Sequence, residues 1–253
     1  MNSQKISAAI LTFNNEKYIE NVLKKLYWCD EIIIMDSYST DATLDICKKY
    51  NATVFQNKFE GFGAQKQLLM SKCKNEWIIS IDSDEILSDE LIKNITNLTV
   101  KNFDDNAGFL IKRRHIFLNR RFNHGKESNI WILRLFNKTK GGVTDNVVHE
   151  SIQITGATAK VNGDLLHYTI DELKEAISKM DRYAQLKAEE YYKRGKKSTW
   201  FKLYINFPFT FFREYILNRN FMNGYEGYLW AILVAQGAGL KYHYLREMYI
   251  KST

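Results

Sequence analysis

Cysteine and proline are both scarce in this chain of 253 residues, and each scarcity excludes a class of protein. A single proline, Pro208, together with 13 glycines, excludes collagen-like, mucin-like and proline-rich linker segments. The three cysteines, Cys29, Cys47 and Cys73, are odd in number and have no CxxC spacing. This argues against a disulfide framework and a structural zinc site, and it fits a reducing compartment.

Long apolar runs are also missing from the sequence. No stretch approaches the roughly 18 consecutive apolar residues of a membrane-spanning helix. The N-terminus has only a short apolar run before polar residues, so we expect no signal peptide. Hydrophobic residues make up 45% of the chain and charged residues 26%, which is typical of a globular protein and not of a disordered one.

Charge is distributed unevenly along the chain, whose formal net charge is +7. Residues 1–100 carry 11 basic and 14 acidic side chains, whereas residues 101–140 carry ten basic against three acidic. Residues 193–219 carry seven basic side chains against one acidic. Basic stretches suit partners that bear phosphate, such as nucleic acid, a nucleotide or an anionic membrane surface; a solvated face is an equal alternative.

The first hundred residues alternate between short apolar runs and segments with apolar residues at helical spacing. The predicted strands are 6–12, 31–35, 53–55 and 77–81, and the predicted helices are 18–26, 41–49, 64–71 and 89–98. Ser88 is the expected N-cap of the last helix, and Thr40 or Asp41 is the expected cap of the second. The alternation predicts an α/β fold with a parallel sheet, in which ligands bind beyond the carboxyl ends of the strands.

The pattern changes after residue 100. We expect strands at 108–112 and 130–136, and short edge strands at 158–161 and 165–167. Beyond residue 170 the spacing indicates helices at 171–194, 199–218 and about 224–247. The expected organisation is a first domain of residues 1–170, followed by a helical, aromatic and basic extension of residues 171–253.

Polar side chains follow the first two predicted strands. Thr12, Asn14 and Glu16 lie in a loop that leads into a helix, where free backbone N–H groups suit a phosphate or a base edge. Most such loops are only turns. Asp36 ends the second strand, and its carboxylate could accept a hydrogen bond from a base or a ribose. A turn that caps the next helix is the alternative interpretation.

Three carboxylates follow the fourth predicted strand within four residues, at Asp82, Asp84 and Glu85. Carboxylates this close repel one another, and such clusters are usually held by a cation. Mg²⁺ and Mn²⁺ accept carboxylate and phosphate oxygens together, which leaves positions open for a diphosphate. The alternative is an acidic turn at the start of the following helix.

These motifs, in this order, resemble the nucleotide-sugar glycosyltransferases of family 2, which have the GT-A fold. The stretches that carry the resemblance are AAILTFNNE, EIIIMDSYSTDAT and WIISIDSDE, the last of which holds an Asp-x-Asp motif as Asp82-Ser83-Asp84. Later stretches resemble the subgroup of lipopolysaccharide- and lipooligosaccharide-core β-1,4-glucosyltransferases: GFGAQKQLL, RLF, VVHESI, LLHYT and FMNGYEGYLWAILVAQ. The resemblance covers nearly the whole chain. It implies inverting transfer of a hexose, glucose from UDP-glucose, to a glycolipid or saccharide acceptor.

The resemblance also implies roles for individual residues. Glu150, beside His149, matches the catalytic base of the family, with a surface ion pair as the alternative. Asp82, Asp84 and His167 match a metal site for Mg²⁺ or Mn²⁺, and an imidazole ligand favours Mn²⁺; a hydrogen-bonded core histidine is the alternative for His167. The residues expected to bind the donor are Thr12, Asn14, Glu16, Asp36, Gln65, Lys66, Asp82 and Arg134. Ordinary surface charge is the alternative for Lys66 and Arg134.

Two positions depart from the family pattern. Many family 2 enzymes have a second Asp after strand two that contacts the uracil, and Ser37 stands there in this chain. The base contact therefore falls either to Asp36 or to the backbone. The subgroup has an aromatic-Pro-Asp stretch after His-Gly, whereas His124 and Gly125 are followed here by Lys-Glu-Ser-Asn, so the acceptor could differ.

The last part of the chain is rich in aromatic residues. Residues 191–230 hold fourteen of the 35 aromatics, interleaved with Lys and Arg, which favours a position on an anionic bilayer. A helical cap packed on the sheet is the alternative. We expect peripheral attachment at the cytoplasmic face of the cell membrane, and no nucleic acid as a partner.

Two other functions are considered for the same sequence. A non-catalytic adaptor on this fold, binding membrane or nucleic acid, would need none of the candidate site residues Asp82, Asp84, Glu150 and His167. A nucleotidyltransferase is disfavoured because no glycine-rich triphosphate loop precedes the first helix. The sequence therefore favours an enzyme that uses a nucleotide sugar.

Overall fold

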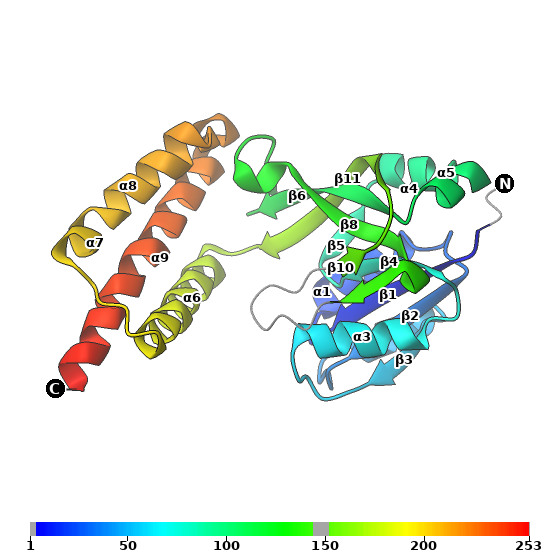
Figure 1. The fold of residues 1–253 in the computed structure, drawn as a ribbon, viewed down its shortest axis with the longest axis horizontal. Coiled ribbons are helices and arrows are strands. Elements are labelled where there is room, and N and C mark those ends of the chain that lie inside the picture. The colour runs from blue at the N-terminus through cyan, green and yellow to red at the C-terminus, as the bar shows by residue number, and fades with distance from the viewer. Residues whose placement is uncertain (1–3, 144–151, 253) are drawn as a thin grey trace. The chain divides into compact units, whose positions relative to one another are not determined.

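Four of the apolar runs pair into the parallel half of a mixed sheet (Figure 1). β1 (Ile6–Thr12) lies between β2 (Glu31–Asp36) and β4 (Trp77–Asp82), and β3 (Thr53–Gln56) pairs with β2. β1 is buried almost throughout, as expected for a parallel strand covered on both faces. The computed structural model that shows this arrangement describes residues 4–143 and 152–252. The four predicted strands are confirmed.

Helices follow the parallel strands: α1 (Glu16–Lys24), α2 (Thr43–Lys49), α3 (Phe62–Lys72), α4 (Asp89–Thr96) and the short α5 (Val100–Asp105). Ser88 caps α4 as predicted, since its hydroxyl accepts a hydrogen bond from the backbone N–H of Leu91 at 3.2 Å. The prediction of Thr40 as a cap of α2 is wrong. Ala42 is the N-cap and makes no side-chain cap hydrogen bond, so Asp41 is not the cap either, although its carboxylate accepts from the backbone N–H of Thr43, the first residue of α2, at 3.0 Å.

The antiparallel half of the sheet continues from β4 through β8 (Ile130–Asn137), β6 (Gly108–Phe117) and β11 (Thr158–Ile170) to β5 (Glu85–Leu87). The prediction of two short edge strands is wrong for the segments 158–161 and 165–167. They form the single strand β11, which lies inside the sheet because β5 pairs with its outer side. The remaining short strands are β7 (Arg120–Arg121), β9 (Gly141–Val143) and β10 (Ile152–Ile154).

Alternate residues of the parallel strands enter two different hydrophobic clusters. Ile10 and Ile34 belong to the larger cluster, which α1 and α4 complete with residues such as Leu23 and Leu91. The neighbouring residues Ala9 and Ile33 belong to the second cluster, with Leu69 and Met70 of α3. This period of two is what places helices on both faces of the sheet and holds the strand ends in a fixed relation.

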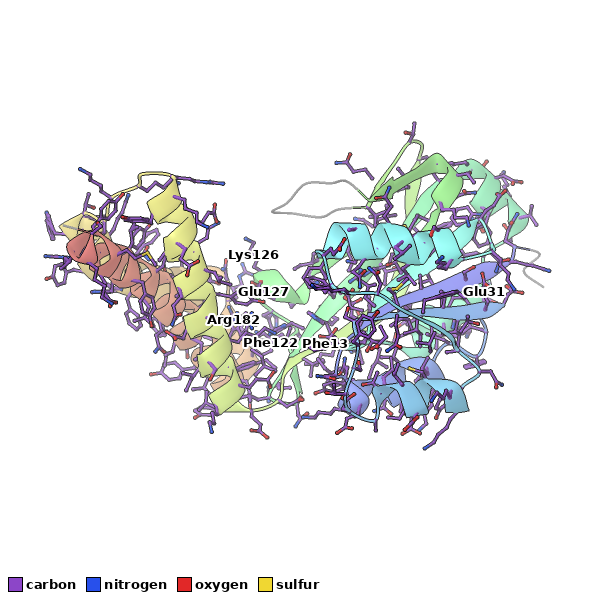
Figure 2. All side chains as sticks on the ribbon, turned by 90° about the horizontal axis from the view of Figure 1, so that it is seen from below. Phe13, Glu31, Phe122, Lys126, Glu127 and Arg182 are labelled. Carbon is purple, nitrogen blue, oxygen red and sulfur yellow. The ribbon has the colours of Figure 1, made fainter. Side chains whose placement is uncertain are left out.

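The chain divides into two compact units, each with a core of its own. Unit 1 comprises residues 1–113 and 130–167, and unit 2 comprises residues 114–129 and 168–253. The predicted boundary at residue 170 lies close to the second of these divisions, and unit 2 also takes in residues 114–129. The core of unit 2 gathers Phe117, Phe122 and Trp230, with Phe122 completely buried (Figure 2).

Helices make up most of unit 2: α6 (Leu173–Lys193), α7 (Trp200–Tyr204), α8 (Asn206–Phe212), a π-helical turn η3 (Arg213–Leu217), a 3-10 turn η4 (Asn220–Asn223) and α9 (Gly224–Lys251). Over the described ranges, no helix is long and apolar enough to cross a membrane. A mixed sheet flanked by helices, followed by a helical extension, confirms the predicted α/β class of the GT-A type.

Gly163 lies within β11, at the point where this strand meets α4. Its φ is +105°, and a Cβ built on it would lie 2.5 Å from the backbone nitrogen of Leu91. We expect Gly163→Ala to lower the free energy of unfolding by about 2–4 kcal/mol, because it combines backbone strain with a clash against a helix backbone. Urea denaturation measures this loss. Gly142→Ala is the control, since a Cβ there meets nothing within 4 Å; equal losses for both variants would contradict the prediction.

Candidate functional site

The loop after β1 holds the loop after β2 in place. Asn14 accepts the backbone N–H of Thr40 at its side-chain oxygen, at 2.8 Å. Glu16 accepts the backbone N–H of Ala42 at 2.9 Å. The sequence predicts that both Asn14 and Glu16 contact the nucleotide-sugar donor. In the structure they lie at the carboxyl ends of the parallel strands, where they order the neighbouring loop.

Thr12 and Asn15 lie at the same edge of the sheet and differ in their hydrogen bonding. The hydroxyl of Thr12 is buried and has no hydrogen-bond partner in the part of the chain that the structure describes. Asn15 donates from its side-chain amide to the Ser83 hydroxyl at 2.7 Å, which joins the loop to the turn after β4. A buried hydroxyl without a partner costs about 1–3 kcal/mol, so Thr12 marks a place where a polar ligand atom would be stabilised.

Asp36 is completely buried at the end of β2, and its carboxylate accepts hydrogen bonds from neighbouring residues of the protein. Both the backbone N–H and the hydroxyl of Ser39 donate to it, and the Gln56 amide donates at 3.0 Å. Gln65, also buried, donates to the Ser37 hydroxyl at 3.1 Å. Asp36 and Gln65 therefore shape the loop that carries Ser37, which is itself partly exposed.

A buried charge network lies directly under the turn after β4. Arg134, on β8, donates from one terminal nitrogen to Asp82 at 2.7 Å and to Glu85 at 2.6 Å. Glu85 is completely buried and the Arg134 side chain is 7% exposed, whereas Asp82 is 35% exposed. Lys66 of α3 lies 3.8 Å from the other oxygen of Asp82. Two cations thus meet two carboxylates at this point of the sheet.

The network shifts the pKa of each of its carboxyl groups in a different direction. Burial raises the pKa of Glu85, although Arg134 acts against it. Burial would also raise the pKa of Asp82, but Arg134 and then Lys66 outweigh it and hold that pKa well below its ordinary value of 3.8. Asp82 therefore stabilises the fold fully above about pH 4, and this contribution is lost as the pH falls towards its lowered pKa.

Asp84 and His167 form a pair beside this network. The His167 Nε2 atom lies 3.4 Å from the Asp84 carboxylate, and the two side chains are 18% and 32% exposed. The pairing of β5 with β11 brings them together, because it sets His167 opposite Glu85. Within residues 4–143 and 152–252, no three His, Cys, Asp or Glu side chains are grouped closely enough to hold a metal ion. Asp82, the third predicted ligand, contacts Arg134 and Lys66 instead.

Glu150 and His149 lie outside the described residues, so the assignment of the base stays a prediction. Glu85 was counted among the three carboxylates but given no role, and the structure makes it the buried partner of Arg134. A sequence signal existed, since Glu85 directly precedes the apolar pair Ile86 and Leu87 of β5.

We expect Arg134→Met to lower the free energy of unfolding by about 3–5 kcal/mol, because it leaves a buried carboxylate without its partner. Chemical denaturation at pH 7 measures the loss. The control is Lys25→Met, which breaks an ion pair of similar length with Asp89, at 2.6 Å, whose carboxylate is 86% exposed. Exposed pairs contribute about 0–1 kcal/mol, so a loss of that size for Arg134→Met would contradict the role of the network.

Comparison with known proteins shows the family to which the chain belongs. Residues 7–161 match the family model described as "Glycosyl transferase family 2". The chain is 28% identical over 260 residues to an uncharacterized glycosyltransferase of Rickettsia typhi, covering 98% of this chain and 89% of that protein. It is 30% identical over 234 residues to the lipopolysaccharide core biosynthesis glycosyltransferase LpsC of Rhizobium meliloti, covering 90% of this chain and 86% of LpsC.

Among solved structures, one similar protein is glucosyl-3-phosphoglycerate synthase from Mycobacterium tuberculosis in complex with Mn²⁺, uridine diphosphate and phosphoglyceric acid. The identity is 23%, the TM-score is 0.36, and the match covers 45% of this chain and 44% of that one. The chain thus spans less than half of that protein. The family model covers more than half of the chain, and LpsC matches most of it. The chain therefore belongs to glycosyl transferase family 2.

Proposed function

We propose that this glycosyltransferase moves glucose from UDP-glucose, with inversion at the anomeric carbon, to a saccharide of a lipopolysaccharide or lipooligosaccharide core. The observation that carries the proposal is the Asp84–His167 pair, which lies next to the Arg134–Asp82 network at the carboxyl ends of parallel strands. Ligands of α/β sheets bind at that edge. The similarity to LpsC, named for lipopolysaccharide core biosynthesis, supports the class of acceptor.

The donor would lie across the loops after β1, β2 and β4. Lys66 is the mobile cation of the site in this proposal, because its 3.8 Å separation from Asp82 leaves it able to contact a diphosphate as well. Arg134 is buried between two carboxylates and positions Asp82 instead of binding phosphate directly. The Thr12 hydroxyl, which has no hydrogen-bond partner among the described residues, would donate to an oxygen of the nucleotide sugar, and the loop held by Asp36 would contact the base.

Asp84 and His167 would hold Mg²⁺ or Mn²⁺ together with the donor diphosphate. Their separation of 3.4 Å suits two neighbouring ligands of one ion, since bonds of about 2.1 Å at right angles place ligand atoms about 3 Å apart. An oxygen and a nitrogen donor suit Mn²⁺ well. The ion, when bound, would supply a Lewis acid for the leaving diphosphate. Only one or two protein ligands are needed where phosphates fill the other positions.

Glu150 would accept the proton of the acceptor hydroxyl as this oxygen attacks the anomeric carbon. The proposal for Glu150 is supported by its match to the family motif in VVHESI. We also propose that the enzyme works at the cytoplasmic face of a membrane and is attached there peripherally. The strongly basic stretch of residues 193–219 supports such an attachment, because anionic leaflets attract clustered Lys and Arg.

A panel of nucleotide sugars tests the reaction. The purified enzyme is mixed with Mn²⁺, one donor at a time, and a delipidated core oligosaccharide, and both diphosphate release and product mass are measured. We expect UDP-glucose to give a product heavier by one hexose, with a β linkage in its NMR spectrum. Transfer from a donor other than UDP-glucose would refute the donor assignment. An α-linked product would refute the inverting mechanism.

Asp84→Asn tests the metal site. We expect transfer to fall by at least about 10²-fold, because the amide is a poor ligand for the ion that stabilises the leaving group. His167→Ala should raise the Mn²⁺ concentration needed for half-maximal rate, with a smaller loss at saturation. Glu90→Gln is the control, since Glu90 is an exposed carboxylate on α4. Full activity of Asp84→Asn in the presence of EDTA would rule out the assigned role.

Glu150→Gln tests the base. We expect the transfer rate to fall by about 10²–10⁴, the usual contribution of a general base, because the amide cannot accept a proton. UDP binding, measured by calorimetry with Mn²⁺, should stay unchanged. A matching loss of UDP affinity would assign Glu150 to the donor pocket and contradict its role as the base.

A further inference from the structure

The helical path from α7 through α8 to η3 turns its apolar side towards solvent. Six of its exposed apolar side chains follow helical spacing and form a stripe, whereas Trp200, Phe207 and Leu217 are also exposed but lie outside it. We call this the outer stripe; it consists of Phe201, Tyr204, Ile205, Phe209, Phe212 and Ile216. Phe209 is 57% exposed and Tyr204 is 66% exposed. Contiguous apolar surface of this kind marks an interaction site on a soluble protein.

The opposite side of the same path is buried and carries polar residues alongside the apolar Leu203, which is 6% exposed. Thr210 is 2% exposed and Glu214 is 6% exposed. Asn206 donates from its amide to the backbone carbonyl of Ala238 in α9 at 2.5 Å. Glu214 accepts from Arg213 at 2.9 Å and from Asn218 at 2.7 Å. A helix surrounded by water normally has the reverse arrangement, with its apolar stripe inward and its polar side outward.

Four lysines converge on two tyrosine rings beside this path, and we call them the lysine cluster: Lys187, Lys196, Lys202 and Lys241. The ammonium groups of Lys196 and Lys241 lie 4.4 and 5.2 Å from the centre of the Tyr191 ring, and that of Lys187 lies 5.8 Å away. Lys241 and Lys202 lie 4.7 and 5.6 Å from the centre of the Tyr242 ring. The ring faces offset only part of the repulsion among these cations.

Within the described residues, Glu190 is the one carboxylate that pairs with the lysine cluster. Lys187 pairs with Glu190 at 2.6 Å, whereas Lys196, Lys202 and Lys241 form no ion pair with any carboxylate in the described ranges. Burial lowers the pKa of Lys241, and the charges of Lys187 and Lys196 lower it further, against the opposing effect of Tyr191. An added anion with several oxygens, such as a phosphate group, would relieve this repulsion and accept hydrogen bonds from the ammonium groups.

The lysine cluster borders the outer stripe along one edge. Lys202 directly follows Phe201 in α7, and its ammonium group contacts Tyr242 of α9. An apolar stripe with basic groups along its edge is the arrangement of helices that lie in a membrane interface, where the charged ends reach the headgroups. The charge complementarity favours an anionic lipid surface over a neutral protein surface as the occupant.

We propose that unit 2 binds an anionic phospholipid leaflet, with the outer stripe at the boundary of headgroups and acyl chains and the lysine cluster on a lipid phosphate. The proposal deepens the proposed function, on which it rests only for the expectation that the acceptor is attached to lipid. It assigns the attachment to particular side chains of α6, α7, α8, η3 and α9. The basic residues Lys193, Arg194 and Lys197, expected from sequence to take part, would contribute only general attraction.

Vesicle sedimentation at physiological salt tests the proposal. We expect the full chain to bind vesicles of phosphatidylglycerol and phosphatidylcholine, and not vesicles of phosphatidylcholine alone. The double variant Lys196→Gln with Lys202→Gln should bind about thirtyfold more weakly, at roughly a factor of five for each lysine near the surface. Its control is Lys93→Gln with Lys101→Gln, which removes two exposed lysines of unit 1.

The double variant Phe209→Ser with Phe212→Ser should also lose at least about tenfold in binding, because it removes apolar burial from the interface. Its control is Tyr27→Ser, at a residue of unit 1 that is 78% exposed. Equal binding to both kinds of vesicle, or no binding of the unaltered chain, would overturn the proposal. So would a dimer in solution that the Phe209 and Phe212 changes dissociate, since the outer stripe would then contact a second copy.

Transfer to the delipidated oligosaccharide separates this proposal from the proposed function. We expect both double variants to keep the rate of the unaltered chain with this soluble acceptor. Vesicle binding without sugar transfer would contradict the proposed function and leave the membrane proposal standing. Sugar transfer without vesicle binding would do the reverse. Circular dichroism and the melting temperature confirm that each variant is folded.

Discussion

The rest of unit 1 depends on one guanidinium group, that of Arg134, which forms ion pairs with two carboxylates. Arg134 is buried, and it holds Asp82 at the surface of the site and Glu85 beneath it. Glu85 would not be stable as a buried charge without this cation, because burial penalises its charged form, whereas Asp82 is 35% exposed and also has Lys66 3.8 Å away. The turn that displays Asp84 lies between these two anchors, so the position of the proposed metal ligand follows from a contact that Asp84 does not itself make.

The loops after β1 and β2, which we propose to contact the nucleotide-sugar donor, are likewise held by hydrogen bonds within the protein. Asn14, Glu16 and Asp36, for which contact with the donor stays a prediction, are each hydrogen-bonded to the backbone or side chains of a neighbouring loop. Such residues pre-organise a site, since a loop that is already ordered loses little entropy when a ligand binds. Among the described residues, the Thr12 hydroxyl has no hydrogen-bond partner and the Lys66 ammonium group lies 3.8 Å from Asp82, and these are the groups we propose to contact the nucleotide-sugar donor.

Most of the fold could be predicted from the sequence, because its strands and helices carry strong local patterns. β1 and β4 are short apolar runs, and α4 begins at a serine cap that the structure confirms. β11 was divided and placed at the edge because its inner position depends on pairing with β5, which is distant in sequence. For the same reason no local pattern could join Arg134 to Asp82, which are 52 residues apart. The aromatic residues of the helical unit are evident in the sequence, but only the helix positions show which of them face outward, such as Phe209, and which are buried, such as Trp230.

The pairing of β5 with β11 also limits where insertions and deletions can occur in this chain. β5 has three residues, and its register sets His167 opposite Glu85, which leaves His167 beside Asp84. Successive residues of a strand point to opposite faces, so a shift of one position would exchange the imidazole for a neighbouring side chain. A single-residue insertion or deletion between Gly163 and His167 would therefore shift the register of β11 and remove the imidazole from the site. Changes of length in this chain should be confined to its loops, and the spacing from the glycine to the histidine should be inherited as a unit.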